Sequence, residues 1–196
     1  KNTDKEDIPD FKTFRFIQLI VEEINKARTN LQKYSEKINH YGKFIETDFL
    51  TERKYLIKQD ELLYLPRGEQ GFKDCSDYLM DLDKKMKSKK KNIKKLKYVH
   101  ELKFPFPKKE ILDENDHFDI DINDLIRKFE GEYEILGFFH FKSLPDPDIS
   151  TMLQIVDQES NGRIRELLLR NTTKFIGVTN RKLNDGNCFV YIILAC

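Results

Sequence analysis

The chain has 196 residues, of which 39% are hydrophobic and 35% charged, and its formal net charge is +1. This length suits one domain with its own core, and the small net charge excludes a protein whose overall field draws it to nucleic acid. No apolar run approaches the ~20 residues that span a bilayer, so we expect no transmembrane helix.

Residues 1–12 are polar, and we expect a loose N-terminal segment there. From residue 12 to about residue 40, apolar side chains recur at helical spacing, which predicts a long amphipathic helix. The pair Thr29-Asn30 can end one helix and cap the next, so we expect a break at that point. Residues 41–70 are interpreted as a loop with short extended pieces.

A second helix is predicted over residues 72–86, with Phe72, Cys75 and Leu79 on one apolar face. Cys75 is then a small core residue. Of the other two cysteines, Cys188 and Cys196 would lie roughly 26 Å apart on one strand, too far to bridge. We therefore expect three free thiols.

A lysine-rich segment follows, in which nine of the fourteen residues from 84 to 97 are lysine. We interpret it as a solvated connection within the domain. The alternative is a surface that holds an anionic partner, such as an acidic protein or the headgroups of an anionic membrane. Almost no aromatic residue interrupts the lysines, which argues against nucleic acid as that partner. The lysines concerned are Lys84, Lys85, Lys87, Lys89, Lys90, Lys91, Lys94 and Lys95.

The "FPFP" sequence at 104–107 excludes a helix there. Beyond it we expect a short helix over 124–129, capped by Asn123, and a strand within "EILGFFHF". The "LPDPD" sequence interrupts the chain, and Asp148 is the predicted cap of the helix that follows.

A further helix is predicted over 162–170. The chain then continues as a hairpin of "KFIGVTN" and "CFVYIILA" around the turn "NDGN". The last strand is apolar on both faces, so it should be central and covered on both sides. Helices flanking a small, mainly antiparallel sheet give an α/β fold, a three-layer α/β/α sandwich, in one domain over 12–196.

Several segments, in order, resemble the CAP superfamily, the cysteine-rich secretory, antigen 5 and pathogenesis-related class 1 (SCP-like) proteins. The first is "LIVEEINKARTNLQKYSEKI", which resembles that family's first helix, above all in its bacterial, plant and protist branch. The similarity continues through "FKDCSDYLMDLDKKM", "LKYVHEL", "DINDLIRKFEGEYEILGFFHF" and "DISTMLQIVDQESNGRIRELLLRNTTKFIGVTN". The resemblance implies the α/β/α sandwich that the periodicity also predicts.

The resemblance also implies a central cleft that in some members holds two histidines and two glutamates and binds zinc. Here that set is degenerate. Phe138 replaces the glutamate after Gly137, and the loop histidine falls on Arg163 or Ile164, neither of which can coordinate zinc. His117 is the candidate for the first histidine. His140 lies on the same strand face as Phe138, so it is the candidate partner of His117 in a rewired site.

We therefore expect a non-enzymatic binding module with a pseudo-active site, whose apolar cleft takes a lipid, a sterol or a protein partner. The resemblance implies secretion or a secretory compartment, and no bound cofactor is expected. Two alternatives stay open. One is a metal-dependent, hydrolase-like CAP protein that binds zinc through His117 and His140. The other is an adhesion module that uses the lysine-rich surface.

Overall fold

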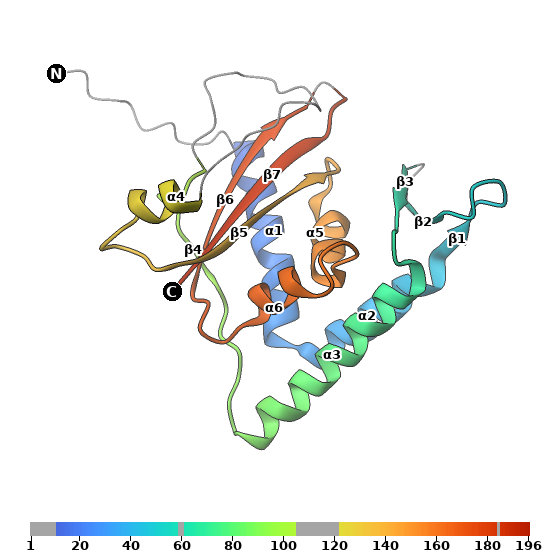
Figure 1. The fold of residues 1–196 in the computed structure, drawn as a ribbon, viewed down its shortest axis with the longest axis horizontal. Helices are drawn as coiled ribbons and strands as arrows, with labels where there is room; N and C mark the ends of the chain where they lie inside the picture. Colours follow the sequence, from blue (N-terminus) through green and yellow to red (C-terminus); the bar gives the residue numbers. More distant parts are fainter. Residues whose placement is uncertain (1–10, 59–60, 105–121, 184) are drawn as a thin grey trace.

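The computed structural model describes residues 11–58, 61–104, 122–183 and 185–196. Helices and two sheets, one of three strands and one of four, make up this part of the chain (Figure 1). The α/β class predicted from the sequence is confirmed. Within the described residues no helix is both long and apolar enough to cross a membrane.

The N-terminal helices are α1 (Phe11–Thr29) and α2 (Leu31–Tyr41), separated by the single residue Asn30. The side chain of Asn30 accepts a hydrogen bond of 3.1 Å from the amide of Lys33 and so caps α2. The predicted break is confirmed. Helix α1 begins at Phe11, one residue before the predicted start at residue 12, and residues 1–10 lie outside the described residues.

A short 3-10 helix, η1 (Gly42–Phe44), leads into a small antiparallel sheet that we call the flap, residues 45–64. Its strands, in order of pairing, are β1 (Ile45–Thr47), β2 (Lys54–Lys58) and β3 (Glu61–Tyr64). Leu56 of β2 is buried against the core and anchors the flap. The prediction of a loop with short extended pieces misses this sheet.

Helix α3 (Gly68–Ser88) begins four residues before the predicted helix and ends two residues after it. Lys84, Lys85 and Lys87 therefore belong to its last turns, and the connection begins only after Ser88. Lysine is a strong helix former and interacts favourably with the C-terminal end of the helix dipole, so the first lysines extend the helix. Cys75 is fully buried on this helix, as predicted, and burial raises its pKa to about 12. All three cysteines are free.

The main sheet has the order β4-β6-β7-β5. Its strands are β4 (Lys97–Tyr98), β5 (Ile135–Ser143), β6 (Phe175–Lys182) and β7 (Cys188–Ala195). Strand β4 pairs with β6 in parallel, and the pairs β6–β7 and β7–β5 are antiparallel. The predicted C-terminal hairpin and the central position of its last strand are confirmed.

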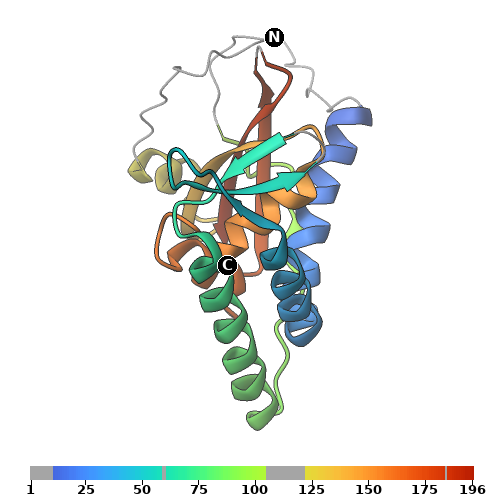
Figure 2. The same ribbon diagram turned by 90° about the vertical axis from the view of Figure 1, so that its right-hand side faces the viewer.

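Both faces of β7 are covered. Val190, Ile192 and Leu194 pack into a cluster with α1, α3, α5 (Pro147–Val156) and α6 (Arg163–Leu169). Tyr191, Ile193 and Ala195 face a second cluster that includes residues 99–104 and helix α4 (Ile122–Lys128). Figure 2 shows α1 and α5 on one side of the sheet. The sheet is thus mainly antiparallel, with helices on both sides.

Two predicted helix caps differ in the structure. Asp146, not Asp148, occupies the cap position of α5, because Pro147 takes the first helical position, where its missing N–H costs no hydrogen bond. Asp148 instead accepts a bond of 2.8 Å from the amide of Ile149. Helix α4 begins at Ile122, so Asn123 lies inside it.

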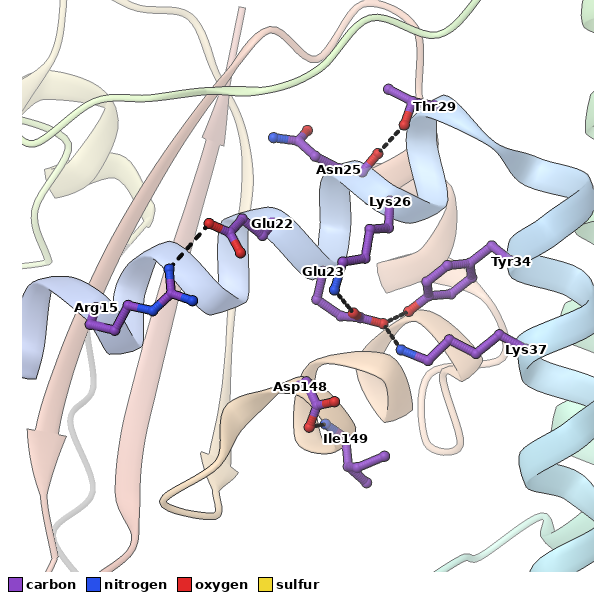
Figure 3. Close-up of polar contacts among 10 residues, drawn as sticks. All are labelled: Arg15, Glu22, Glu23, Asn25, Lys26, Thr29, Tyr34, Lys37, Asp148 and Ile149. Carbon is purple, nitrogen blue, oxygen red and sulfur yellow. Dashed lines mark hydrogen bonds and ion pairs between the residues drawn. The ribbon is translucent and has the colours of Figure 1, made fainter.

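Two buried charges fix α1 to its neighbours. Glu23 accepts a 2.6 Å hydrogen bond from the Tyr34 hydroxyl and ion pairs with Lys37 and with Lys26, which ties α1 to α2 (Figure 3). Arg28 is 1% exposed, and its partners among the described residues are backbone carbonyls. Its partners are Lys94, Leu168, Arg170 and Thr173.

Candidate functional site

Two of the predicted cleft residues meet in one hollow. His140 of β5 and Ile164 of α6 both line a space of about 380 Å³, which we call the β5 cleft. Tyr64 of the flap forms another wall, and Asp157, Gln158 and Glu159 line it from the loop between α5 and α6. The cleft therefore lies where the free edge of the main sheet approaches the flap.

Phe138 and Arg163, two other predicted cleft residues, do not line this cleft. The Phe138 ring lies 6.5 Å from the Phe104 ring and packs against the second cluster. Arg163 is exposed at the start of α6. His117 lies outside the described residues. Apolar side chains such as Leu153 and Phe189 line the β5 cleft together with carboxylate and amide groups, so its lining is mixed.

His140 lies against aromatic rings. Its imidazole is 5.2 Å from the Phe189 ring and 5.1 Å from the Tyr191 ring. Partial burial lowers the pKa of His140, and the nearby Glu159 carboxylate acts in the opposite direction. Burial prevails, so His140 is neutral at physiological pH and can accept or donate a hydrogen bond in the cleft.

We predict that His140 titrates below its ordinary value of 6.5. As the pH falls, the unfolded chain then binds this proton before the folded chain does. Stability therefore declines below about pH 6.5 until the folded imidazole is also protonated. Phe189→Ala, which opens one side of the ring to water, should raise the midpoint toward 6.5. NMR titration of the imidazole resonances measures the titration midpoint of His140 in the wild-type chain and in the variant. A wild-type midpoint at or above 6.5 would contradict the prediction.

Asp157 organises the loop beside the cleft, and sequence reasoning missed it. It ends α5 in the left-handed conformation, at φ 55°. Its buried carboxylate accepts hydrogen bonds from the Ser160 amide and hydroxyl and from the Ile164 amide, at 2.7 to 2.9 Å. One side chain therefore sets both the turn and the start of α6.

Gln158 links the same loop to α3. Its side-chain oxygen accepts a 2.9 Å bond from the Arg67 amide, and its nitrogen donates to the Gly68 carbonyl at 3.2 Å. It thus provides the capping bond that the Arg67 side chain does not make at the start of α3. The cleft wall is fixed by this contact between residues about 90 positions apart in the chain.

A zinc site has no complete ligand set in the part of the chain that the structure describes. No group of three or more histidine, cysteine, aspartate or glutamate side chains gathers there in a way that suits a metal ion. His140 and Glu159 supply two candidate ligands, whereas a catalytic zinc ion takes three from the protein. The predicted partner, His117, lies outside this part, so the metal alternative stays a prediction.

A second hollow, of about 400 Å³, lies beside the N-terminal half of α1, and we call it the α1 pocket. Its apolar walls include Phe16, Leu19 and Pro145. Its cations are Lys12, Arg15 and Lys182, of which Arg15 pairs with Glu22 at 3.4 Å. An apolar interior with a cationic rim suits an amphiphilic anion, and the volume lies in the range of small-molecule sites. Sequence reasoning missed this pocket.

The lysine end is the name that we give to the eight lysines from Lys84 to Lys95 identified in the sequence. All eight are exposed. Lys84 pairs with Asp81 at 3.5 Å and Lys87 with Asp83 at 2.6 Å, and the other six make no ion pair with described residues. The lysine end therefore keeps most of its charge for an external anion.

Comparison with known proteins leaves the family open. No family model, curated protein or solved structure matches the chain. The CAP resemblance therefore remains a hypothesis based on the quoted segments.

Proposed function

We propose that the chain is a non-enzymatic binding module that holds an anionic amphiphilic lipid, such as a fatty acid, in the α1 pocket. The observation that carries this proposal is the combination of apolar walls at Phe16 and Leu19 with the cationic rim at Lys12 and Lys182. Burying about ten methylenes contributes roughly 8 kcal/mol, before the costs of ordering the ligand are subtracted. The positive charge of the rim favours an anionic headgroup.

We further propose that the scaffold is a divergent CAP domain of a secreted protein. The support is that segments carrying the resemblance pack on one another. Arg28, in "EINKARTN", bonds to the carbonyls of Leu168, Arg170 and Thr173, in "RELLLRNTT". The mainly antiparallel sheet with helices on both faces is compatible with the sandwich that the family implies.

The lipid proposal predicts binding of palmitate that depends on the rim charge. Lys182→Glu should weaken palmitate binding about three- to tenfold, because it replaces an attraction near the carboxylate by a repulsion. Lys174→Glu, an exposed lysine just before the opposite end of β6, is the matched control and should have no effect. Leu19→Trp, which fills the pocket, should weaken binding more than tenfold. Titration calorimetry measures each constant.

Neutral probes separate the headgroup from the tail. Palmitate methyl ester should bind the wild-type chain more weakly than palmitate, and cholesterol should bind more weakly still. Equal affinity for the ester and the acid would show that the positive charge of the rim does not contribute to binding. Failure of all three probes to bind the wild-type chain would reject lipid binding altogether and favour a protein partner.

A second candidate function is attachment to an acidic partner through the lysine end, supported by six exposed lysines that pair with no described acid. Such contact is electrostatic, so it should weaken steeply as salt shortens the screening length.

A further inference from the structure

The tip of the flap presents two large apolar side chains to water. Phe49 is 98% exposed and Leu50 is 96% exposed. The turn that carries them is held by Asp48, whose carboxylate accepts bonds of 2.8 and 3.0 Å from the amides of Leu50 and Thr51. The Asp48 amide also donates to the Arg53 carbonyl at 2.9 Å. The turn is therefore well defined, and adjacent exposed apolar groups on such a turn indicate a contact surface.

The charges around the tip restrict its partner. Glu46, Asp48 and Glu52 are all exposed there, against the cation Arg53, and the neighbouring cation Lys54 pairs with Glu69. Anionic phospholipid headgroups would repel this surface. The tip instead suits an apolar hollow with a basic rim.

The chain itself has such a hollow at the lysine end. A groove of about 230 Å³ lies between α3 and α6, with Leu82, Met86, Ile93 and Leu169 among its apolar walls. An engineered cavity of roughly 150 Å³ accommodates benzene, so the groove can admit the ring of Phe49.

The lining of this groove is itself neutral, and helical spacing places lysines beside it. Arg170 and Glu166 are both in its lining and offset each other. Lys85 and Lys89 follow Leu82 and Met86 by three positions at the end of α3, so they lie beside the apolar stripe. Neither pairs with a described acid, and both are exposed, which leaves the rim with an excess of positive charge.

Tip and groove cannot meet within one molecule. The flap adjoins the N-terminal end of α3, whereas the groove lies along its C-terminal half (Figures 1 and 2). Helix α3 has 21 residues and is therefore about 30 Å long.

We propose that the flap tip of one copy docks into the lysine-rimmed groove of a second copy, a head-to-tail contact in which the acidic and basic rims face each other. The acidic partner proposed above for the lysine end is then a second copy of this chain. The contact uses neither the α1 pocket nor its lipid, so the two proposals fail independently. Because each copy keeps one free tip and one free groove, association continues beyond a dimer unless it closes into a ring.

Sedimentation velocity of the wild-type chain up to about 1 mM, the range of weak small interfaces, tests the proposal. We expect concentration-dependent association that weakens at about 0.5 M salt. Phe49→Ser/Leu50→Ser and Lys85→Glu/Lys89→Glu should each remain monomeric. The matched controls are Ile126→Ser, an exposed apolar residue on α4, and Lys73→Glu, an exposed lysine near the start of α3, and both should associate as wild type. Circular dichroism verifies that each variant is folded.

Mixing the two monomeric variants is the decisive step. The tip variant keeps an intact groove and the groove variant keeps an intact tip, so the mixture should form a one-to-one dimer that grows no further. A wild-type chain that stays monomeric overturns the proposal. A mixture that fails to pair also overturns it, because the contact is then not tip to groove. Flotation of the wild-type chain with anionic vesicles, lost in the tip variant, would overturn it in favour of a membrane.

Discussion

Arg28→Met is expected to lower the free energy of unfolding by about 4 kcal/mol, because it leaves buried carbonyls without donors. The guanidinium of Arg28 donates to four of them, including bonds of 2.8 Å to Lys94 and 2.9 Å to Thr173. These carbonyls belong to the lysine-rich connection, to the last turn of α6 and to the segment between α6 and β6. Burial lowers the pKa of Arg28 to about 10, so the side chain is still a cation at neutral pH. Methionine fills a similar volume but has no N–H to offer.

Urea unfolding of the wild-type chain and of Arg28→Met measures this loss as a shift of the midpoint. Arg15→Met is the matched control on the same helix. Arg15 is half exposed and makes one 3.4 Å ion pair with Glu22, so its loss should cost less than about 1 kcal/mol. Arg28→Lys should fall between the two, because lysine keeps the charge but cannot reach carbonyls on several sides at once.

An Arg28→Met variant within about 1 kcal/mol of the wild-type chain would contradict this account. In that case water would have to reach the carbonyls that the guanidinium now covers. Backbone hydrogen exchange at the segment between α6 and β6 distinguishes the two outcomes, since a wetted segment exchanges faster than a sealed one.

The parts of the fold that could be predicted are those governed by local rules. The break between α1 and α2 follows from Asn30, whose side chain caps the next residues along the chain. The central strand β7 follows from a run of apolar residues that has no polar face. The flap could not be predicted in this way, because β1 has only three residues and pairs with β2 across a turn without a glycine signal.

In the candidate sites, too, only the features governed by local rules could be predicted. Strand periodicity places Phe138 and His140 on one face of β5, and this holds in the structure, where both lie opposite residues of the second cluster. Periodicity does not say that His140 lies near the end of an edge strand, beside the cleft, whereas Phe138 packs against Phe104. The α1 pocket takes its walls from segments that are far apart in the sequence, around residues 12–19, 145 and 180–188. No local pattern brings such segments together.

Gly177→Ala is expected to destabilise the chain by about 3 kcal/mol, because a methyl group at this position has no room. Gly177 lies in β6 opposite Ile193, under residues 99–104, which cross that face of the sheet. A Cβ atom on Gly177 would lie 1.9 Å from the Leu102 carbonyl oxygen and 2.4 Å from the Leu102 Cβ. The obstacle is backbone, so the added methyl can be accommodated only if the crossing segment moves off the sheet.

Gly137→Ala is the matched control in β5. There the added Cβ would lie 2.5 Å from the Leu167 Cδ2, the end of a flexible side chain that can rotate away, so we expect a loss of about 1 kcal/mol or less. Urea midpoints of the two variants, measured together, separate a backbone obstacle from a side-chain one. Equal losses would mean that the segment at Leu102 yields as readily as the Leu167 side chain. The close approach of residues 99–104 to β6 would then not be the reason that a glycine occupies position 177.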